Sequence, residues 1–195
     1  MPPTDHSIQA ADLLEEHIKT FKSLSHLSQN LEHLAKIMST CLINGNKIMW
    51  MGNGGSASQS QHFAAELVGR FNVERPGIAS ISLSSDTAVI TAVGNDYDFS
   101  NIYSRQVESI GSKNDILVGI STSGNSINVV KALGVARNMS IKTIGMTGVS
   151  SGKMEKHCDE ILNVPSKNTA RIQEAHLWIG HVLCELVETK VSIPN

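Results

Sequence analysis

The 195-residue chain has little cysteine, few aromatic residues and no long apolar run. Its three cysteines, Cys41, Cys158 and Cys184, are odd in number and lack C-x-x-C spacing, which argues against a disulfide framework and a thiolate zinc site. No apolar run reaches the roughly 18 residues of a membrane span, and residues 1–6 lack the basic and apolar regions of a signal peptide. We therefore expect buried free thiols, a cytoplasmic location and no membrane partner.

The chain also lacks a large excess of charge of either sign. It has 16 Lys and Arg against 18 Asp and Glu, for a formal net charge of -2. Nucleic-acid binding usually needs a basic field, so we expect a small molecule or a protein as partner and no nucleic acid. No low-complexity segment, short repeat or domain linker interrupts the sequence, and its length fits a single domain over 1–195.

Helical periodicity dominates the first 45 residues. Two sets of apolar residues recur at helical spacing: Leu14, Ile18, Phe21 and Leu24, then Leu31, Leu34, Met38 and Leu42. Asn44 and Gly45 follow the second set, and glycine is common just beyond the end of a helix. We therefore predict a pair of N-terminal helices over 1–45.

Beyond residue 45, short apolar runs alternate with helical patterns. The runs lie near 47–51, 78–83, 115–121, 141–147 and 160–164, and a last helical pattern covers 168–190. Such alternation is typical of a parallel sheet with helices on both faces. The prediction for 46–195 is an α/β fold: a three-layer, flavodoxin-like sandwich with a five-stranded parallel sheet flanked by helices and a long C-terminal helix.

Two short turns rich in glycine and serine follow apolar runs: Gly52-Asn53-Gly54-Gly55-Ser56 and Ser121-Thr122-Ser123-Gly124-Asn125-Ser126. Both fall where a parallel strand would pass into a helix, so backbone N–H groups and hydroxyls are free for a ligand. Neither has G-x-G-x-x-G spacing or the lysine of a P-loop, which argues against a nucleotide. One such turn can be only a tight connection. Two in one small domain favour a site for a phosphate or a polyol.

His62 and Glu66 lie four residues apart in a helical segment directly after the first of these turns. They share a helix face, so together they can bind a divalent ion, or the carboxylate can carry a proton beside the imidazole. An exposed surface pair is the alternative. Their position beside a ligand-binding turn favours the functional interpretation.

The last helix carries four polar residues among apolar neighbours: Gln173, Glu174, His176 and His181. Gln173 and His181 lie eight residues apart, about 12 Å along a helix, so one metal ion could barely be reached from both. We therefore predict that copies of this helix from different subunits contribute to one site. For His176 we favour a packed or interface histidine over a metal ligand.

A third polar segment, Gly94-Asn95-Asp96, follows the helical run 86–93. We expect it to form a loop that supplies an amide and a carboxylate. Such a pair usually serves turn formation, and contact with a ligand is the less frequent alternative.

Five motifs, in the same order, resemble the phosphoheptose isomerases of the sugar isomerase (SIS) domain family: G-N-G-G-S at 52–56, H-F-A-A-E-L at 62–67, G-N-D at 94–96, G-I-S-T-S-G-N-S at 119–126 and A-R-I-Q-E-A-H at 170–176. The resemblance covers nearly the whole chain. It implies conversion of sedoheptulose 7-phosphate to D-glycero-D-manno-heptose 7-phosphate, the first step toward ADP-heptose and the heptose of bacterial lipopolysaccharide. It also implies a homotetramer with one zinc ion per subunit and with sites at subunit interfaces.

The resemblance also implies residue roles. The zinc ligands fall on His62, Glu66, Gln173 and His181. The substrate contacts fall on Asn53, Gly54, Gly55, Asn95, Asp96, Ser121, Thr122, Ser123, Ser126 and Gln173. Exchanging a C2 ketone for a C1 aldehyde moves a proton between neighbouring carbons through an enediol, so we assign Glu66 as the base and His181 as the acid, with zinc polarising the carbonyl. Some relatives have an acidic residue where this chain has Ala170, so a role of that acid does not apply here.

Two other functions compete with this one. A relative in the same family binds the bacterial replication initiator without catalysis, and it resembles this chain through both turns and the R-I-Q-E segment. That relative lacks the acid matching Glu66 and the histidine matching His181, whereas both are present here, which favours the isomerase. The other alternative is an isomerase of a hexose or pentose phosphate, or a sugar-sensing regulatory domain. The small size of the chain and the H-F-A-A-E-L segment argue against it.

Overall fold

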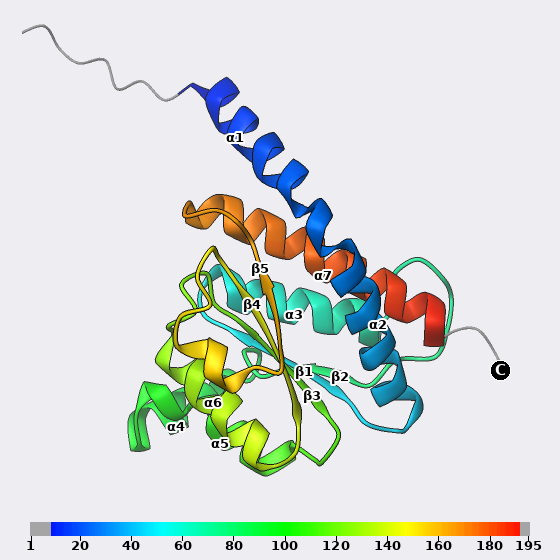
Figure 1. Cartoon of the computed structure of the whole chain (residues 1–195). Coiled ribbons are helices and arrows are strands. Elements are labelled where there is room, and N and C mark those ends of the chain that lie inside the picture. Colours follow the sequence, from blue (N-terminus) through cyan, green and yellow to red (C-terminus); the bar gives the residue numbers. More distant parts are fainter. Residues whose placement is uncertain (1–8, 192–195) are drawn as a thin grey trace, which may run out of the picture.

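A parallel sheet of five strands forms the middle layer of the protein, as Figure 1 shows for the computed structural model, which describes residues 9–191. The strands are β1 (Ile48–Gly52), β2 (Ser80–Ser82), β3 (Ile116–Ile120), β4 (Lys142–Thr147) and β5 (Glu160–Asn163). Their order across the sheet is β2-β1-β3-β4-β5, and every neighbouring pair is parallel. The predicted flavodoxin-like sheet is confirmed, and each strand lies within a few residues of its predicted position.

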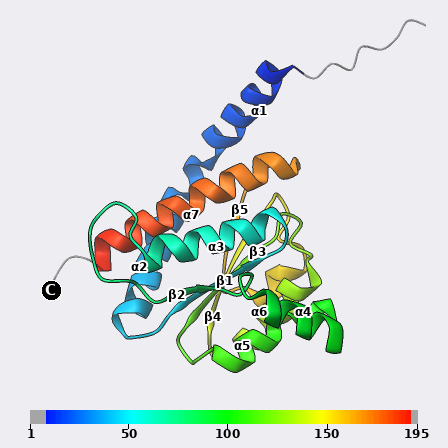
Figure 2. The ribbon, with the colours of Figure 1, turned by 180° about the vertical axis from the view of Figure 1, so that it is seen from behind.

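Helices cover both faces of this sheet. The elements are α1 (Ala10–Lys22), η1 (Ser23–Leu27), α2 (Ser28–Ile43), α3 (Gly55–Val68), α4 (Thr87–Asp96), η2 (Phe99–Asn101), α5 (Ser104–Ile110), α6 (Ile127–Asn138), η3 (Gly152–His157) and α7 (Thr169–Val191). Alternate side chains of a strand point to opposite faces. Trp50 of β1 therefore packs in the core under α2, α3 and α7, whereas Met51 packs in the core with α5 and α6 (Figures 1 and 2).

The N-terminal helices form as predicted, but they differ in burial. Helix α2 packs along α7 and ends before Gly45, whose φ of +79° suits glycine. Leu31 and Leu34 of α2 are almost completely buried. Helix α1 extends beyond the sandwich (Figure 1), and its apolar residues Leu14 and Ile18 are 58% and 42% exposed. Within residues 9–191, the apolar stripe of α1 is therefore largely left uncovered.

Helix α4 corrects one prediction. Asn95 and Asp96 were expected in a loop, but both lie in the last turn of this helix. The Asp86 side chain accepts a hydrogen bond from Val89 N at 3.0 Å and so caps its start, and Gly94 does not stop it, because the helical hydrogen bonds continue past that residue. Within the described part of the chain, α4 also has no buried residue despite its apolar sequence.

The strand order places the two glycine turns side by side. After β1 the chain crosses to β2 on one side, and β3 lies on the other side of β1, so the order reverses between β1 and β3. In open parallel sheets, ligands bind beyond the carboxyl ends of the strands at this reversal. The turns at 52–56 and 121–126, called the first and second turn below, leave β1 and β3 at that point. None of the helices within 9–191 has the length and apolar composition needed to cross a bilayer.

Candidate active site

Hydroxyl groups of buried side chains donate hydrogen bonds to the backbone of the first turn. The Gly52 carbonyl accepts a hydrogen bond from the Tyr103 hydroxyl and another, at 3.1 Å, from Ser84 Oγ. An added Cβ at Gly52 would lie 2.7 Å from Ser56 Cβ, and Gly54 has a φ of +55°, so both positions require glycine. The result is a rigid turn whose outer residues, including Gly55, face solvent at the start of α3.

The second turn gathers hydroxyl groups. Ser121 Oγ lies 2.9 Å from Ser126 Oγ and 3.5 Å from Ser123 Oγ. Gly124 has a φ of +66°, and an added Cβ there would lie 2.2 Å from the Ser151 carbonyl oxygen. These hydroxyls sit at the start of α6, where backbone N–H groups lack helical partners, so the turn can bind an anion without a charge of its own.

A lysine that the sequence did not single out lies beside the second turn. Lys167 lines a small cavity of about 240 Å³ together with Thr122, Ser123 and Ser166. We expected phosphate binding through hydroxyls and a helix N-terminus alone. Lys167 is therefore a further candidate for contact with a phosphate at this turn.

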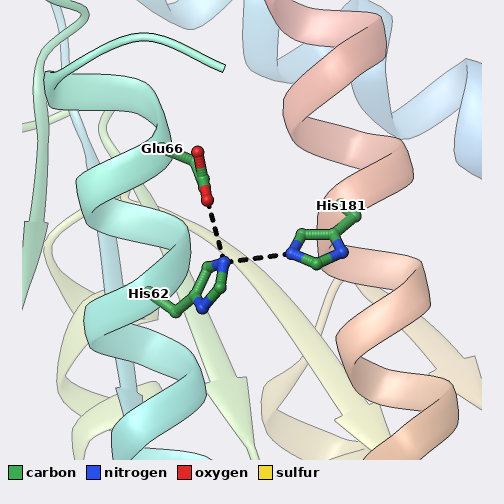
Figure 3. A group of neighbouring side chains, drawn as sticks. All are labelled: His62, Glu66 and His181. Atoms are coloured by element: carbon green, nitrogen blue, oxygen red, sulfur yellow. Dashed lines mark hydrogen bonds and ion pairs between the residues drawn. The ribbon is translucent and has the colours of Figure 1, made fainter. Parts of the chain in front are cut away.

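Two helices bring an imidazole, a carboxylate and a second imidazole together. His62 and Glu66 project from α3 toward His181 on α7 (Figure 3). His62 Nε2 lies 2.8 Å from Glu66 Oε1 and 3.0 Å from His181 Nε2. The side chain of His62 is 44% exposed and that of Glu66 is 25% exposed, so the group is open to solvent. The predicted pair His62 and Glu66 and the predicted His181 of the last helix therefore form one cluster.

Close contact between α3 and α7 sets the geometry of this cluster. Phe63, next to His62, is fully buried, and its ring faces Gly180, next to His181. A Cβ added at Gly180 would lie 2.1 Å from that ring, so only glycine permits this approach of the two helices. The position of His181 relative to His62 thus depends on a residue without a side chain.

A buried ion pair fastens the far ends of the same two helices. Glu188, near the end of α7, lies 2.8 Å from Arg75 Nε, and the two side chains are only 2% and 4% exposed. The Glu188 carboxylate also accepts backbone N–H bonds from Phe71, Asn72 and Val73. Burial alone would raise the pKa of Glu188, but these N–H groups and Arg75 outweigh it and lower that pKa. Arg75 Nη2 in turn donates to the Glu66 carbonyl at 2.9 Å, so the pair holds the helix that carries Glu66.

The three clustered side chains fit zinc. One ligand atom from each of His62, Glu66 and His181 lies within 4.8 Å of the others. Two imidazoles and a carboxylate form the ligand set of several catalytic zinc sites. Zinc bonds of about 2.0–2.1 Å would hold two nitrogens roughly 3.3 Å apart in a tetrahedral site, close to the 3.0 Å between the Nε2 atoms here.

The remaining predicted residues lie apart from this cluster. The Gln173 side chain lies against Gly55, at the first turn, where an added Cβ would be 2.7 Å from Gln173 Nε2. Asn95 and Asp96 are exposed at the end of α4, and Asn95 donates to Asp96 Oδ1 at 2.9 Å. His176 is fully buried with Nε2 at 3.1 Å from the Thr147 carbonyl oxygen. Burial lowers the pKa of His176 to about 4, which confirms a packed, neutral histidine.

Sequence reasoning missed several residues that support the site. They are Tyr103 and Ser84 under the first turn, Asn128 between the two turns, Lys167 beside the second turn, and the pair Arg75 and Glu188. Asn128 and Glu188 each interrupt an apolar stripe on a helix, and that pattern is a signal for a buried polar contact.

Comparison with known proteins identifies the family. The model of the SIS domain matches residues 11–148. A phosphoheptose isomerase of Aliarcobacter butzleri is 50% identical over 171 residues, which cover 88% of this chain and 90% of that protein. The solved phosphoheptose isomerase of Neisseria gonorrhoeae superposes with a TM-score of 0.87 at 40% identity, over 92% of this chain and 96% of that one. The one from Francisella tularensis gives 0.89 at 39% identity, with the same coverage.

The chain belongs to the phosphoheptose isomerase family. It is therefore an enzyme of the isomerase class. The match to the SIS model ends at residue 148, so it includes both turns and α3 but not α7, which carries His181. The contact between His62 of α3 and His181 of α7 is therefore seen in the structure, because α7 lies outside the residues that match the SIS model.

Proposed function

We propose that this protein converts sedoheptulose 7-phosphate to D-glycero-D-manno-heptose 7-phosphate in the biosynthesis of ADP-heptose and lipopolysaccharide. The observation that carries the proposal is the convergence of His62, Glu66 and His181 on α3 and α7, in a chain that is 50% identical to a phosphoheptose isomerase. The two turns that follow the neighbouring strands β1 and β3 add hydroxyl and backbone donors for a sugar phosphate. Aldose–ketose isomerisation needs a group that removes a proton from carbon and a group that serves the neighbouring oxygens. This cluster supplies both.

Glu66 is the proposed base. Its Oε1 contacts His62, and the second carboxylate oxygen takes no part in that contact. A carboxylate can take the proton from C1 of the ketose and return it to C2 as the double bond of the enediol shifts. His181, on the opposite helix, can donate a proton to one sugar oxygen and accept one from the other.

Zinc is the proposed cofactor, one ion per subunit, with His62, Glu66, Gln173 and His181 as its ligands. When bound, it would polarise the sugar carbonyl and stabilise negative charge on the oxygens. The fit of the two imidazoles and the carboxylate to zinc chemistry supports this proposal. Gln173 lies about 12 Å along α7 from His181, which favours a contribution from a second subunit.

The second turn is the proposed phosphate site. Ser121, Thr122, Ser123 and Ser126 surround the start of α6, where hydroxyl and backbone donors favour an anion. Asn53, Gly54 and Gly55 of the first turn would contact the oxygens of the sugar. Asn95 and Asp96 are proposed as further substrate contacts, and their exposed position on α4 suits a site completed at a subunit interface.

A homotetramer is proposed as the active form. One uncovered apolar surface supports association: α1, where Leu13, Leu14 and Ile18 are at least 42% exposed. The proposed location is the cytoplasm. Cys41, Cys158 and Cys184 are free, as expected of a reducing compartment, and we propose no nucleic-acid or membrane partner.

Purified protein incubated with sedoheptulose 7-phosphate tests the function directly. We expect an aldoheptose phosphate as product, a zinc content near one ion per chain, and loss of both activity and zinc after chelation. Fructose 6-phosphate and ribulose 5-phosphate serve as comparison substrates, and preferred turnover of either would replace this proposal by another sugar-phosphate isomerase. Absence of turnover with all three, together with binding of the replication initiator, would favour the non-catalytic alternative.

A further inference from the structure

Asn128 joins the two turns through a reciprocal pair of side-chain amides. Asn53 Nδ2 lies 2.9 Å from Asn128 Oδ1, and Asn128 Nδ2 lies 2.8 Å from Asn53 Oδ1. Asn128 is only 3% exposed and is the second residue of α6. Asn53, in the first turn (52–56), is half-buried. The pair therefore connects a buried residue of α6, two positions after the second turn, to a partly exposed residue of the first turn.

A backbone N–H group fixes the direction of this pair. Val129 N donates to Asn128 Oδ1 at 2.9 Å, and a backbone N–H can only donate. The atom it contacts must therefore be the amide oxygen of Asn128. The other end of that amide is the NH2 group, which must face the Asn53 oxygen, so the Asn53 oxygen points inward.

The consequence for Asn53 follows from counting its hydrogen-bonding groups. Its oxygen accepts from Asn128, with the Tyr103 hydroxyl also 3.3 Å away. One hydrogen of its NH2 group goes to Asn128 Oδ1, and the second remains. The polar group that Asn53 can offer a ligand is thus an N–H donor and not a carbonyl.

We propose that Asn128 is a positioning residue, which holds the Asn53 amide so that its free N–H donates to an oxygen of the sugar. The inference rests on the proposed isomerase function. An N–H donor stabilises that oxygen most when it carries negative charge, as it does in the enediolate. Reversal of the amide would place a carbonyl oxygen against the same atom and repel it.

A double-mutant cycle tests whether Asn128 acts through Asn53. The parent, Asn53→Ala, Asn128→Ala and the double variant are assayed for kcat, KM and thermal unfolding. We expect Asn128→Ala to lower kcat/KM about tenfold, mainly through kcat, in the parent background, and by less than about twofold once Asn53 is Ala. Equal losses in both backgrounds would show that Asn128 only caps α6 and would overturn the inference.

Asn128→Asp tests the direction of the pair without changing its size. The ionised carboxylate has no hydrogen to give to the Asn53 oxygen, whereas the protonated acid does. The activity of this variant relative to the parent at the same pH should therefore rise as the pH falls from about pH 8 to about pH 5, where carboxyl groups begin to protonate. A ratio that stays constant over this range would contradict the proposed direction. This test also stands if Asn128→Ala fails to fold.

Asn46→Ala is the matched control. Asn46 also donates two side-chain hydrogen bonds, to the Lys113 carbonyl and to Asp115 Oδ1. It lies just before β1, at the amino ends of the strands and away from the two turns. We expect it to lower the unfolding temperature and leave kcat and KM unchanged. Turnover by the parent is measured first, so its absence counts against the proposed function, whereas an active parent with additive losses overturns only the role of Asn128.

Discussion

The first and second turns occupy equivalent places in the fold but are built from different chemistry. The first turn leads into α3, whose next turns carry His62 and Glu66. The second leads into α6, and its own side chains are hydroxyls that contact one another. Both contain a glycine at positive φ, Gly54 in the first turn and Gly124 in the second.

We interpret this difference as a division between proton transfer, near the first turn, and phosphate binding, at the second. Titratable groups that can move protons follow the first turn, whereas the second offers neutral donors that suit a phosphate group. Changes near the first turn should therefore act mainly on kcat, and changes at the second mainly on KM. If changes at both turns altered the same constant, the proposed division of roles between the two turns would be contradicted.

The largest effect is expected from Glu66→Gln. The amide keeps the size of the side chain but cannot accept the carbon-bound proton, so kcat should fall by about 10² to 10⁴. Unfolding temperature and oligomeric state should stay unchanged. Glu108→Gln, which alters an exposed pair with Arg105 on α5, is the control and should keep full turnover. Turnover of Glu66→Gln within a few-fold of the parent would remove Glu66 from the role of base.

Loss of the Glu188–Arg75 pair should destabilise the packing of α7 against α3, the helix that follows the first turn. Glu188→Ala leaves a buried guanidinium uncompensated and should lower the free energy of unfolding by roughly 3–5 kcal/mol. Since the folded state lowers the pKa of Glu188, its contribution is complete above the ordinary glutamate pKa and is lost as the pH falls through the lower folded-state value. Chemical denaturation of Glu188→Ala and the parent measures the loss, and the difference between the parent and Glu188→Gln at several pH values measures its pH dependence. A difference that does not shrink in acid would contradict it.

Replacement of Ser121 and Ser123 together by Ala should weaken attachment of the phosphate. Each hydroxyl can give a charge-assisted hydrogen bond, so we expect KM to rise at least about tenfold with kcat much less affected. Ser109→Ala, on α5, is the matched control and should leave both constants unchanged. If KM for sedoheptulose 7-phosphate stays at the parent value, the phosphate binds elsewhere, with Lys167 as the next residue to change.

The smallest effect comes from mixing two inactive variants. If one site takes Gln173 and His181 from different subunits, Gln173→Ala and His181→Ala chains reassembled in equal amounts should restore both groups in about a quarter of the sites. Zinc content and turnover of the mixed tetramers measure the recovery. Mixed tetramers that remain as inactive as their parents would place both residues in the site of a single subunit.

The sequence allowed much of this fold to be predicted, because periodicity and turn residues are local signals. The five strands, α2 and α7 follow directly from apolar spacing. Helix α4 extends through Gly94, Asn95 and Asp96, for which the sequence predicts a loop. One glycine is a weak stop signal when the hydrogen bonds on both sides continue.

The sequence predicts His62, Glu66 and His181 as candidate site residues, but it does not predict how they are arranged. His62 and His181 are 119 positions apart, and their contact depends on the packing of Phe63 against Gly180. Arg75 and Glu188 are likewise 113 positions apart. Spacing along one helix can place His62 beside Glu66, but it carries no information on which other helix lies opposite.

Gly180 gives the site a mechanical property. With no side chain between them, α3 and α7 touch through the Phe63 ring, and the helix spacing is transmitted directly to the gap between His62 and His181. The distance between His62 Nε2 and His181 Nε2 therefore follows the spacing of the two helices. A partner chain or substrate that changed this spacing would change the distance between the two imidazoles, and so the fit of the proposed metal site, without contacting either histidine.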